Sequence, residues 1–338
     1  MTTEALAAAG LDPTGIAGGR VAQWAGNTRF GGDAVYVVEA DEYDKSFLAL
    51  SAEVAVINNV EADHLECYGS LEALEDAFAQ FARPARRVIA GADDPGASRV
   101  AVRAGRPTWT VGVAAQADVR IANLRQAPTG STATVQLPGG KTAELKLKVP
   151  GAHNVRNAAA ALAVTLELGG NVDAALQALA AFEGVGRRFE LVGSAAGVTV
   201  VDDYAHHPTE IAATLEGARQ AYPRRRLVAV FQPHLFSRTA LHGEAMGKAL
   251  SRADVVVVTD VYAAREAPIA GVSGKLVADA ARRPDGEVHW VAKRSDLVAE
   301  VASVVKSGDV VLTLGAGDVT AVGRDLLARL AERKGSAA

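Results

Sequence analysis

The sequence V-Y-V-V-E-A-D-E-Y-D at residues 35–44 is followed by V-A-V-I-N-N-V-E-A-D-H at residues 54–64. In each segment a short apolar run, rich in β-branched residues, ends abruptly in carboxylates. Such a run, bounded by polar residues, is typical of a buried strand in a parallel sheet. Ligands of open α/β sheets bind at the carboxyl ends of the strands. We therefore expect Val35–Val38 and Val54–Val60 in one sheet, with both acidic clusters and His64 along its functional edge.

The residue types at this edge predict a bound cation. The polar residues that follow the two runs are Glu39, Asp41, Glu42, Asp44, Glu61, Asp63 and His64. Carboxylate oxygens with one imidazole suit a hard divalent cation that also binds phosphate, and Mg²⁺ is the usual choice. The alternative is a set of solvated loop charges. Because both strands end in the same way, we favour the ligand site.

Length and composition restrict the class of protein. The 338 residues suit two domains, and 49% apolar with 22% charged residues indicates a soluble protein with a large core. The net charge of −4 argues against a partner that is a nucleic acid. The single cysteine, Cys67, excludes a disulfide framework and fits a reducing cytoplasm. We expect no membrane span and no signal peptide, because no run of 18 apolar residues occurs and the first ten residues lack a basic start.

The pattern changes three times along the chain. Alternating apolar and polar residues over Asp118–Val149 predict a small antiparallel sheet, and an alanine-rich helix follows to about Leu168. The glycine-bracketed segment Gly184–Glu190 is expected to be a hinge. Beyond it, strands alternate with helices, which predicts a doubly wound, Rossmann-like parallel sheet. We therefore predict an α/β protein with domains at residues 1–183 and 184–338. The strands expected in the second domain are Val198–Val201, Leu227–Phe231, Val255–Thr259, Val288–Val291 and Val310–Leu314.

The segment D-D-Y-A-H-H-P-T-E, residues 202–210, follows the first strand of the second domain and opens a helix. The carboxyl end of a strand beside a helix N-terminus is a ligand position. A helix cap with a core histidine is the alternative. Because His206 and His207 are adjacent and cannot both point into the core from one short loop, we favour a functional role.

Other candidate residues are weaker when taken singly. Arg238 follows the next strand and could bind a carboxylate or phosphate, whereas Asn154 and Asn157 lie one turn apart at a helix start. The turn L-G-A-G-D-V-T at residues 314–320 fits either phosphate binding or tight packing. No Walker A loop, G-x-x-x-x-G-K-[ST], occurs in the sequence, and residues 272–276 resemble only its tail.

Taken in order, these segments resemble the Mur ligase family over nearly the whole chain. The matching motifs are E-A-D-E-Y-D-x-S-F, N-x-E-A-D-H-L, H-N-x-x-N-A-A-A-A, G-x-G-R-R-F-E, D-D-Y-A-H-H-P-T-E, Q-P-H-x-F-S-R-T, Y-x-A-R-E-x-P-I-x-G-V and G-A-G-D. They are most similar to the branch that attaches L-alanine to UDP-N-acetylmuramate. The related murein-peptide ligases share E-A-D-E-Y-D and A-H-H-P-T but fit two other motifs less well.

The resemblance implies a cytoplasmic ligase of peptidoglycan precursor synthesis, on which cell shape and division depend. Such an enzyme uses ATP and Mg²⁺ to convert the carboxylate of UDP-N-acetylmuramate into an acyl phosphate. The amine of L-alanine then attacks this intermediate, and phosphate leaves as the amide forms. Negative charge develops at phosphorus and then at a tetrahedral oxygen, so cations are needed at both.

The resemblance also assigns roles to particular residues. Glu39 and His64 would be the Mg²⁺ ligands. Asn154, Asn157 and Arg188 would hold the nucleotide, with Asp203 near its ribose, and Tyr204, His206 and Arg238 would face the amino acid and the acyl phosphate. The expected catalytic set is Glu39, His64, Arg188, Asp203 and His206.

Two departures from the family pattern change what is expected. Leu235 stands where the family pattern has an arginine, which removes one cation from the substrate side. In the family a UDP-sugar domain and a phosphate loop precede the helix that corresponds to Thr2–Ala9. We therefore expect this chain to lack its first strand and phosphate loop, and to be inactive alone unless a longer chain supplies the missing domain in cis.

Two other classes of function stay open from the residues themselves. The chain could be a non-catalytic remnant of two domains that binds an amino acid or nucleotide without turnover. It could also be a different α/β enzyme with a metal at Glu39 and His64, such as a phosphatase, which the motif series disfavours.

Overall fold

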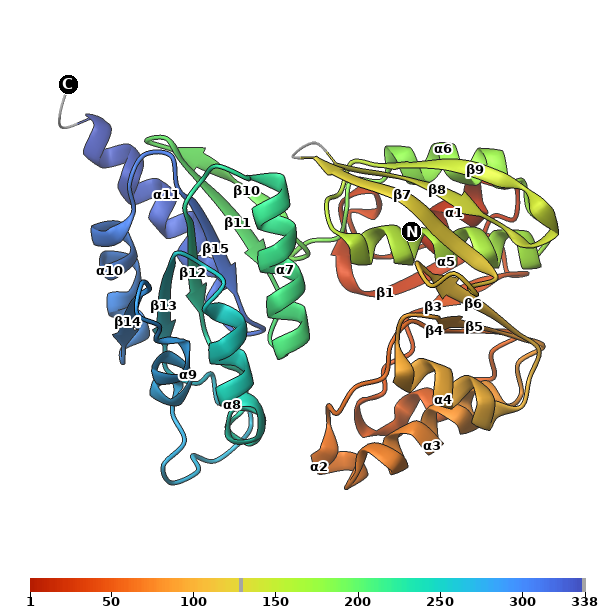
Figure 1. Cartoon of the computed structure of the whole chain (residues 1–338), viewed down its shortest axis with the longest axis horizontal. Helices are drawn as coiled ribbons and strands as arrows, with labels where there is room; N and C mark the ends of the chain where they lie inside the picture. The colour runs from red at the N-terminus through yellow and green to blue at the C-terminus, as the bar shows by residue number, and fades with distance from the viewer. Residues whose placement is uncertain (128–129, 336–338) are drawn as a thin grey trace. The chain divides into compact units, whose positions relative to one another are not determined.

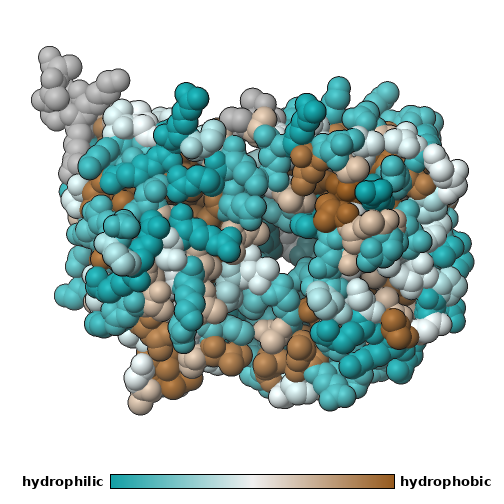
Figure 2. Space-filling view, viewed as in Figure 1, coloured by the Kyte–Doolittle hydropathy of each residue, from teal (hydrophilic) through white to brown (hydrophobic). Residues whose placement is uncertain are grey.

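The computed structural model describes residues 1–127 and 130–335, and the chain divides into two compact units, Met1–Glu183 and Gly184–Ala338. Both are mixed α/β units (Figure 1). No helix among the described residues is long and apolar enough to cross a membrane. Polar side chains dominate the face in Figure 2, and apolar groups appear there only in small, scattered groups. This distribution agrees with the burial of the apolar strand segments in the two cores.

A six-stranded mixed sheet organises the first unit, in the order β4-β5-β6-β7-β8-β9. Its strands are β4 (Val54–Ile57), β5 (Arg87–Gly91), β6 (Thr108–Gly112), β7 (Val119–Ala127), β8 (Gly130–Gln136) and β9 (Thr142–Leu147). The pairs from β4 to β7 are parallel, and β7, β8 and β9 are antiparallel neighbours. The antiparallel strands expected over Asp118–Val149 therefore form, and they continue the parallel sheet. Alternate residues of β9 are buried and exposed, as the polar–apolar alternation predicts.

The expectation that Val35–Val38 forms a buried strand in the same sheet as Val54–Val60 was wrong. Strand β3 (Tyr36–Val38) belongs to a separate three-stranded sheet with β1 (Thr14–Val21) and β2 (Gly26–Arg29), in the order β2-β1-β3. Tyr36 is 60% exposed and Val38 39% exposed, whereas Val37 packs against the core. Tyr36 and Val38 stand beside Thr14 and Ile16 of β1, and Ile16 is itself 43% exposed, so no described element of this sheet covers the outer face of β3. Hydrophobic pattern alone could not detect this, because a run of four apolar residues does not reveal its neighbours.

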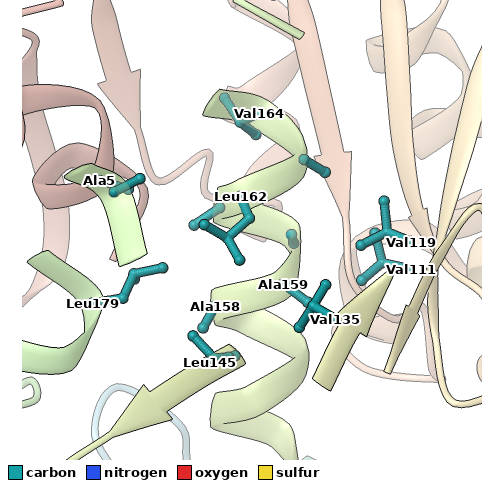
Figure 3. Packing of buried hydrophobic residues seen from close by; sticks show 14 of the residues in the cluster. Ala5, Val111, Val119, Val135, Leu145, Ala158, Ala159, Leu162, Val164 and Leu179 are labelled. Carbon is teal, nitrogen blue, oxygen red and sulfur yellow. The ribbon is translucent and has the colours of Figure 1, made fainter. Parts of the chain in front are cut away.

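Helix α5 (Ala152–Glu167) is the centre of the first core. Its run Ala158–Ala161 is almost wholly buried, because methyl side chains let the helix approach its neighbours closely. In Figure 3, Ala5 and Leu179 lie on one side of α5, and Val111, Val119 and Val135 of the sheet lie on the other. The first two belong to α1 (Thr2–Ala8) and α6 (Val172–Ala181). The other face of the sheet is covered by α3 (Leu71–Ala82) and α4 (Pro95–Ala104), while α2 (Leu65–Tyr68) precedes α3.

The second unit is the expected doubly wound sheet, in the order β10-β11-β15-β12-β13-β14. Its strands are β10 (Glu190–Ala195), β11 (Val198–Asp203), β12 (Leu227–Phe231), β13 (Val255–Thr259), β14 (Glu287–Val291) and β15 (Val310–Leu314). Helices α7 (Pro208–Ala221), α8 (Phe236–Leu250) and α9 (Gly274–Ala281) cover one face, and α10 (Leu297–Val304) and α11 (Thr320–Gly335) cover the other.

Strand β15 lies between β11 and β12, and all three run parallel. Their carboxyl ends, where Asp203, Phe231 and Leu314 stand, are therefore adjacent. The chain segments that follow these strands meet at one edge of the sheet, which is the position where ligands of doubly wound sheets bind.

We predict that Leu162→Ala lowers the free energy of unfolding by about 2–5 kcal/mol, because it removes a fully buried side chain from the middle of α5 and leaves a cavity. Val102→Ala serves as the control, because Val102 is 81% exposed on α4, and its cost should stay within about 0.5 kcal/mol. Urea unfolding followed by circular dichroism measures both. A loss below about 1 kcal/mol for Leu162→Ala would contradict this view of the core.

Candidate functional site

The last two residues of β11, Asp202 and Asp203, are both buried but have different partners. Asp202 accepts hydrogen bonds from the hydroxyl groups of Thr313 and Thr320 and forms an ion pair with Arg187, whose Nε lies 3.1 Å from Oδ2. It connects β11 to β15 and to the start of α11. Asp202 is therefore a structural carboxylate.

Asp203 faces a different environment. Its Oδ2 accepts the backbone N–H of Phe189 and its Oδ1 that of Ala205, each at 2.8 Å. Burial raises the pKa of Asp203 to about 6, although these N–H groups and the Arg188 guanidinium oppose the rise. Both oxygens already accept a backbone N–H, so a ribose hydroxyl would have to share them with the main chain. The expected ribose contact stays a prediction.

The adjacent arginines Arg187 and Arg188 differ sharply in their surroundings. Besides its ion pair with Asp202, Arg187 donates from Nη2 to the carbonyl oxygen of Gly315 at 2.6 Å. The Arg188 side chain is 52% exposed. It forms an ion pair with Glu210, in which Nη1 lies 3.5 Å from Oε1. Arg188, the predicted ligand residue, is thus the arginine that has a guanidinium available. The anchoring role of Arg187 was missed, because nothing in the spacing of G-V-G-R-R-F-E separates the two residues.

Tyr204 lies against both arginines. The guanidinium carbon of Arg187 is 4.8 Å from the centre of the ring, and that of Arg188 is 5.6 Å from it. The His206 ring meets the same ring edge to face, with centroids 5.4 Å apart. Tyr204 was expected to line the substrate site, and the structure places it as the surface on which Arg188 rests.

The helix start after β11 holds the two histidines. His207 is the N-cap of α7 and forms a capping box with Glu210, while Pro208 occupies the first turn. His206 Nδ1 lies 3.0 Å from the Tyr204 carbonyl oxygen and 3.3 Å from Glu210 Oε2. Both histidines are partly accessible, as the argument against two adjacent core histidines predicted.

The segment after β12 contributes His234 and Arg238 to the same edge. Arg238 is only 7% exposed, and its Nη1 lies 3.4 Å from His234 Nδ1. The His234 ring stacks on Tyr262 with centroids 5.7 Å apart, and its centroid is 6.3 Å from that of His206. The structure therefore brings together His206 and Arg238, two of the predicted substrate residues, through His234.

The glycine turn after β15 is closely packed. A Cβ at Gly317 would lie 2.4 Å from Gln232 Oε1 and 2.7 Å from Cγ of Tyr262, so a larger residue does not fit without displacement. The buried Gln232 side chain donates to Asp318 and accepts the N–H of Val319. Of the two interpretations of this turn, the contacts support tight packing.

Leu235, the departure from the family pattern, is the N-cap residue of α8, with φ +69° and ψ 136°. Positive φ is unusual for a bulky L-residue and costs of order 1–3 kcal/mol. The conformation is held by hydrogen bonds from Leu235 N–H to the Tyr262 carbonyl oxygen and from Thr239 to the Leu235 carbonyl oxygen. The strained residue presents no charge to the site.

In the first unit, Glu39 and His64 are found in different surroundings. Glu39 is exposed, and its Oε2 accepts the N–H of Gly18 at 2.8 Å. His64 has φ +52°, and its ring nitrogens lie 3.5 Å from Glu42, 3.8 Å from Asp63 and 3.4 Å from Glu66. A hydrogen bond from His64 is the largest influence on Glu42 and lowers the pKa of that carboxyl. The pairing of His64 with Glu42 was not predicted.

The donor atoms of Glu39 and His64 differ in how well they suit Mg²⁺. Within residues 1–127 and 130–335, no group of three or more His, Cys, Asp or Glu side chains could hold a metal ion. Mg²⁺ usually binds one or two carboxylates together with waters and substrate phosphates, so such a group is not required. The exposed carboxylate of Glu39 fits this role. The imidazole of His64 fits it less well, because imidazole suits softer metals.

The two asparagines occupy the first turns of α5, half-buried and one turn apart. Asn154 donates from Nδ2 to the carbonyl oxygen of Pro150 at 2.7 Å. The side-chain amide of Asn157 makes no hydrogen bond to any part of the chain that the structure describes. Asn157 is therefore the better placed of the two to bind a ligand.

Comparison with known proteins gives consistent matches. A family model described as Mur ligase middle domain matches residues 31–165, and one described as Mur ligase, glutamate ligase domain, matches residues 187–317. A UDP-N-acetylmuramate–L-alanine ligase of Kineococcus radiotolerans is 48% identical over 98% of this chain and 72% of that protein.

Solved structures match over the same extent. The UDP-N-acetylmuramate-alanine ligase of Thermotoga maritima superposes with a TM-score of 0.79 and 31% identity, over 100% of this chain and 72% of its own. A murein peptide ligase of Psychrobacter arcticus gives a TM-score of 0.70 and 25% identity, over 98% of this chain and 74% of its own.

We predict that Asp203 makes stability fall as pH rises from about 4 to 7. Below its ordinary pKa of 3.8 the carboxyl is protonated in both states, whereas above about 6 it is charged in the folded state at a cost of burial. The raised pKa of about 6 corresponds to a total loss of about 3 kcal/mol.

The test compares urea unfolding of the wild type and Asp203→Asn across this pH range. The wild type should lose about 3 kcal/mol relative to the variant as pH rises. Asp285→Asn, at an exposed loop position, controls for the replacement of a carboxylate by an amide. A difference between wild type and Asp203→Asn that does not change with pH would contradict the raised pKa.

Proposed function

The chain belongs to the Mur ligase family, and from that premise we propose that it joins L-alanine to UDP-N-acetylmuramate at the expense of ATP. The observation that carries the proposal is the convergence of Arg188, His206 and Arg238 at the carboxyl ends of β11 and β12. These groups stand where a doubly wound sheet binds its ligands. The 48% identity to the Kineococcus ligase supports the choice of substrates.

Both steps of the reaction develop negative charge that these side chains would have to balance. The substrate carboxylate attacks the γ-phosphorus of ATP, ADP leaves, and an acyl phosphate remains. The amine of L-alanine then attacks the acyl carbon, and inorganic phosphate leaves as the amide forms. Arg188 and Arg238 would balance negative charge on phosphate, carboxylate or tetrahedral oxygen, because fixed cations in a site of low dielectric stabilise such charges strongly.

His206 is placed to manage a proton in the second step. The ammonium group of L-alanine must lose a proton before it can attack, and an imidazole titrates near neutral pH. The His206 ring lies between the Tyr204 carbonyl oxygen and the Glu210 carboxylate, so its orientation is restricted. We assign to His206 the role of accepting that proton or of holding the amino acid.

In the first unit we propose that Asn154 and Asn157 hold the nucleotide and that Glu39 and His64 hold Mg²⁺. When bound, Mg²⁺ would neutralise part of the charge on the phosphates. The protein residues would orient the nucleotide and hold the cation. The side-chain amide of Asn157 can donate and accept hydrogen bonds, and the exposed carboxylate of Glu39 attracts a cation.

A murein-peptide ligase is the second candidate function. It rests on the superposition with the Psychrobacter structure, which covers 98% of the chain. The lower identity, 25% against 31% for the alanine ligase structure, makes it the weaker choice. The two activities differ in the amine that is consumed, a free amino acid or a tripeptide, so one assay separates them.

The assay uses residues 1–338 and a chimera in which the part of the Kineococcus ligase that this chain does not match is added ahead of Met1, where the family pattern has a UDP-sugar domain and a phosphate loop. For the chimera we predict UDP-N-acetylmuramoyl-L-alanine, detected by mass spectrometry, only when ATP, UDP-N-acetylmuramate and L-alanine are all present. Residues 1–338 alone should form none, because they contain no phosphate loop motif. Arg238→Ala in the chimera should lower kcat/KM about 100-fold or more.

Other outcomes would change the assignment. Faster phosphate release with the tripeptide than with L-alanine would favour the murein-peptide ligase. Binding of ATP or L-alanine by the chimera without any product would favour a non-catalytic binding protein. Product formation by residues 1–338 alone would refute the expected inactivity.

A further inference from the structure

One carboxylate, that of Glu210, contacts both His206 and Arg188. Its Oε2 accepts the backbone N–H groups of His206 at 3.0 Å and of His207 at 3.2 Å, and lies 3.3 Å from the Nδ1 of His206. Its Oε1 lies 3.5 Å from Nη1 of Arg188. The residue stands at the third position of α7, where a glutamate of a capping box normally binds only the backbone.

The charge of Glu210 is maintained by its partners. Burial by itself would raise the pKa of this carboxyl, but His206, the two backbone N–H groups and Arg188 together lower it. The carboxylate is therefore ionised and can act on both side chains at neutral pH. A helix cap alone would not require this charge, because glutamine also occurs at this position of a capping box.

Arg188 has few other contacts in the described part of the chain, whereas the His206 ring also lies against the Tyr204 carbonyl oxygen. The Arg188 guanidinium rests 5.6 Å from the Tyr204 ring centre and is 52% exposed. The His206 ring meets Tyr204 at 5.4 Å and faces His234 at 6.3 Å. A long arginine side chain that has only a ring face as support would sample several rotamers, so a fixed charge beside it sets its direction.

We propose that Glu210 is a positioning residue, which holds the Arg188 guanidinium and the His206 imidazole in the orientations that ligation uses. This inference rests on the proposed function. Glu210 itself touches neither substrate nor phosphate and acts only through Arg188 and His206. The substitution Glu210→Gln separates this role from helix capping, because the amide oxygen can still accept the two backbone N–H groups.

The first experiment needs no ligase activity. Histidine ring resonances of residues 1–338 are followed by NMR across pH 5–9, in the wild type and in Glu210→Gln. Removing a carboxylate 3.3 Å from the ring should lower the pKa of His206 by about one unit. Glu216→Gln, an exposed position on the same helix, should leave it unchanged. An unchanged His206 pKa in Glu210→Gln would overturn the proposal for His206.

The second experiment measures coupling in the chimera. Glu210→Gln should lower kcat/KM for ligation about tenfold, with Glu216→Gln as the control. In an Arg188→Ala background the same substitution should cost clearly less, because the side chain that it positions is absent. Equal losses in both backgrounds would overturn the proposal for Arg188. If the wild-type chimera forms no product, the proposed function fails, and the NMR result still decides the contact with His206.

Discussion

The partly buried ion pair between Arg187 and Asp202 is the interaction on which the edge of the second unit depends. Arg187 also donates to the carbonyl oxygen of Gly315, so one guanidinium connects the entry segment, the end of β11 and the turn after β15. Asp202 is 2% exposed. Loss of one partner of such a pair typically costs about 3–5 kcal/mol, because the remaining buried carboxylate loses its counter-charge and keeps only the two threonine hydroxyl groups. The three segments are therefore fixed relative to one another.

This anchor determines what the neighbouring residues can do. Arg187 adopts φ +59° and directs its side chain to Asp202, whereas Arg188 reaches Glu210; both guanidinium groups lie against the Tyr204 ring. Asp203, the next residue of β11, then binds the N–H of Phe189 instead of a guanidinium. Arg187 and Asp202 thus form the anchoring ion pair, whereas Asp203 binds main-chain N–H groups and Arg188 reaches Glu210.

Local sequence pattern predicted the second unit well and the first unit less well. Strands β12, β13 and β15 begin and end where their apolar runs placed them, and helix α7 begins in the segment at residues 202–210 that was expected to open a helix. Strand β10 was not predicted, because Gly193 and Ser194 weaken its β pattern and it pairs only at an edge. The sheet to which β3 belongs depends on pairing with β1, a long-range contact that a local run of apolar residues cannot encode.

The site shows the same division. Motif spacing identified the segments that meet at the edge, including His206 and Arg238. It could not tell Arg187 from Arg188, because that difference arises from the depth of Asp202 in the sheet. It also missed His64 with Glu42 and Glu210 with His206, since each pair is formed by the local path of a loop or a helix start. Backbone geometry, more than residue type, sets these contacts.

The division of labour between the two arginines is tested most directly by urea unfolding of residues 1–338 carrying Arg187→Ala or Arg188→Ala. We predict that Arg187→Ala lowers the free energy of unfolding by about 3–5 kcal/mol, and that Arg188→Ala lowers it by no more than about 1 kcal/mol, because the ion pair of Arg188 is half exposed. If Arg187→Ala does not fold, Arg187→Lys provides the comparison and should still lose more than Arg188→Ala. Equal losses, or a larger loss for Arg188→Ala, would contradict the account.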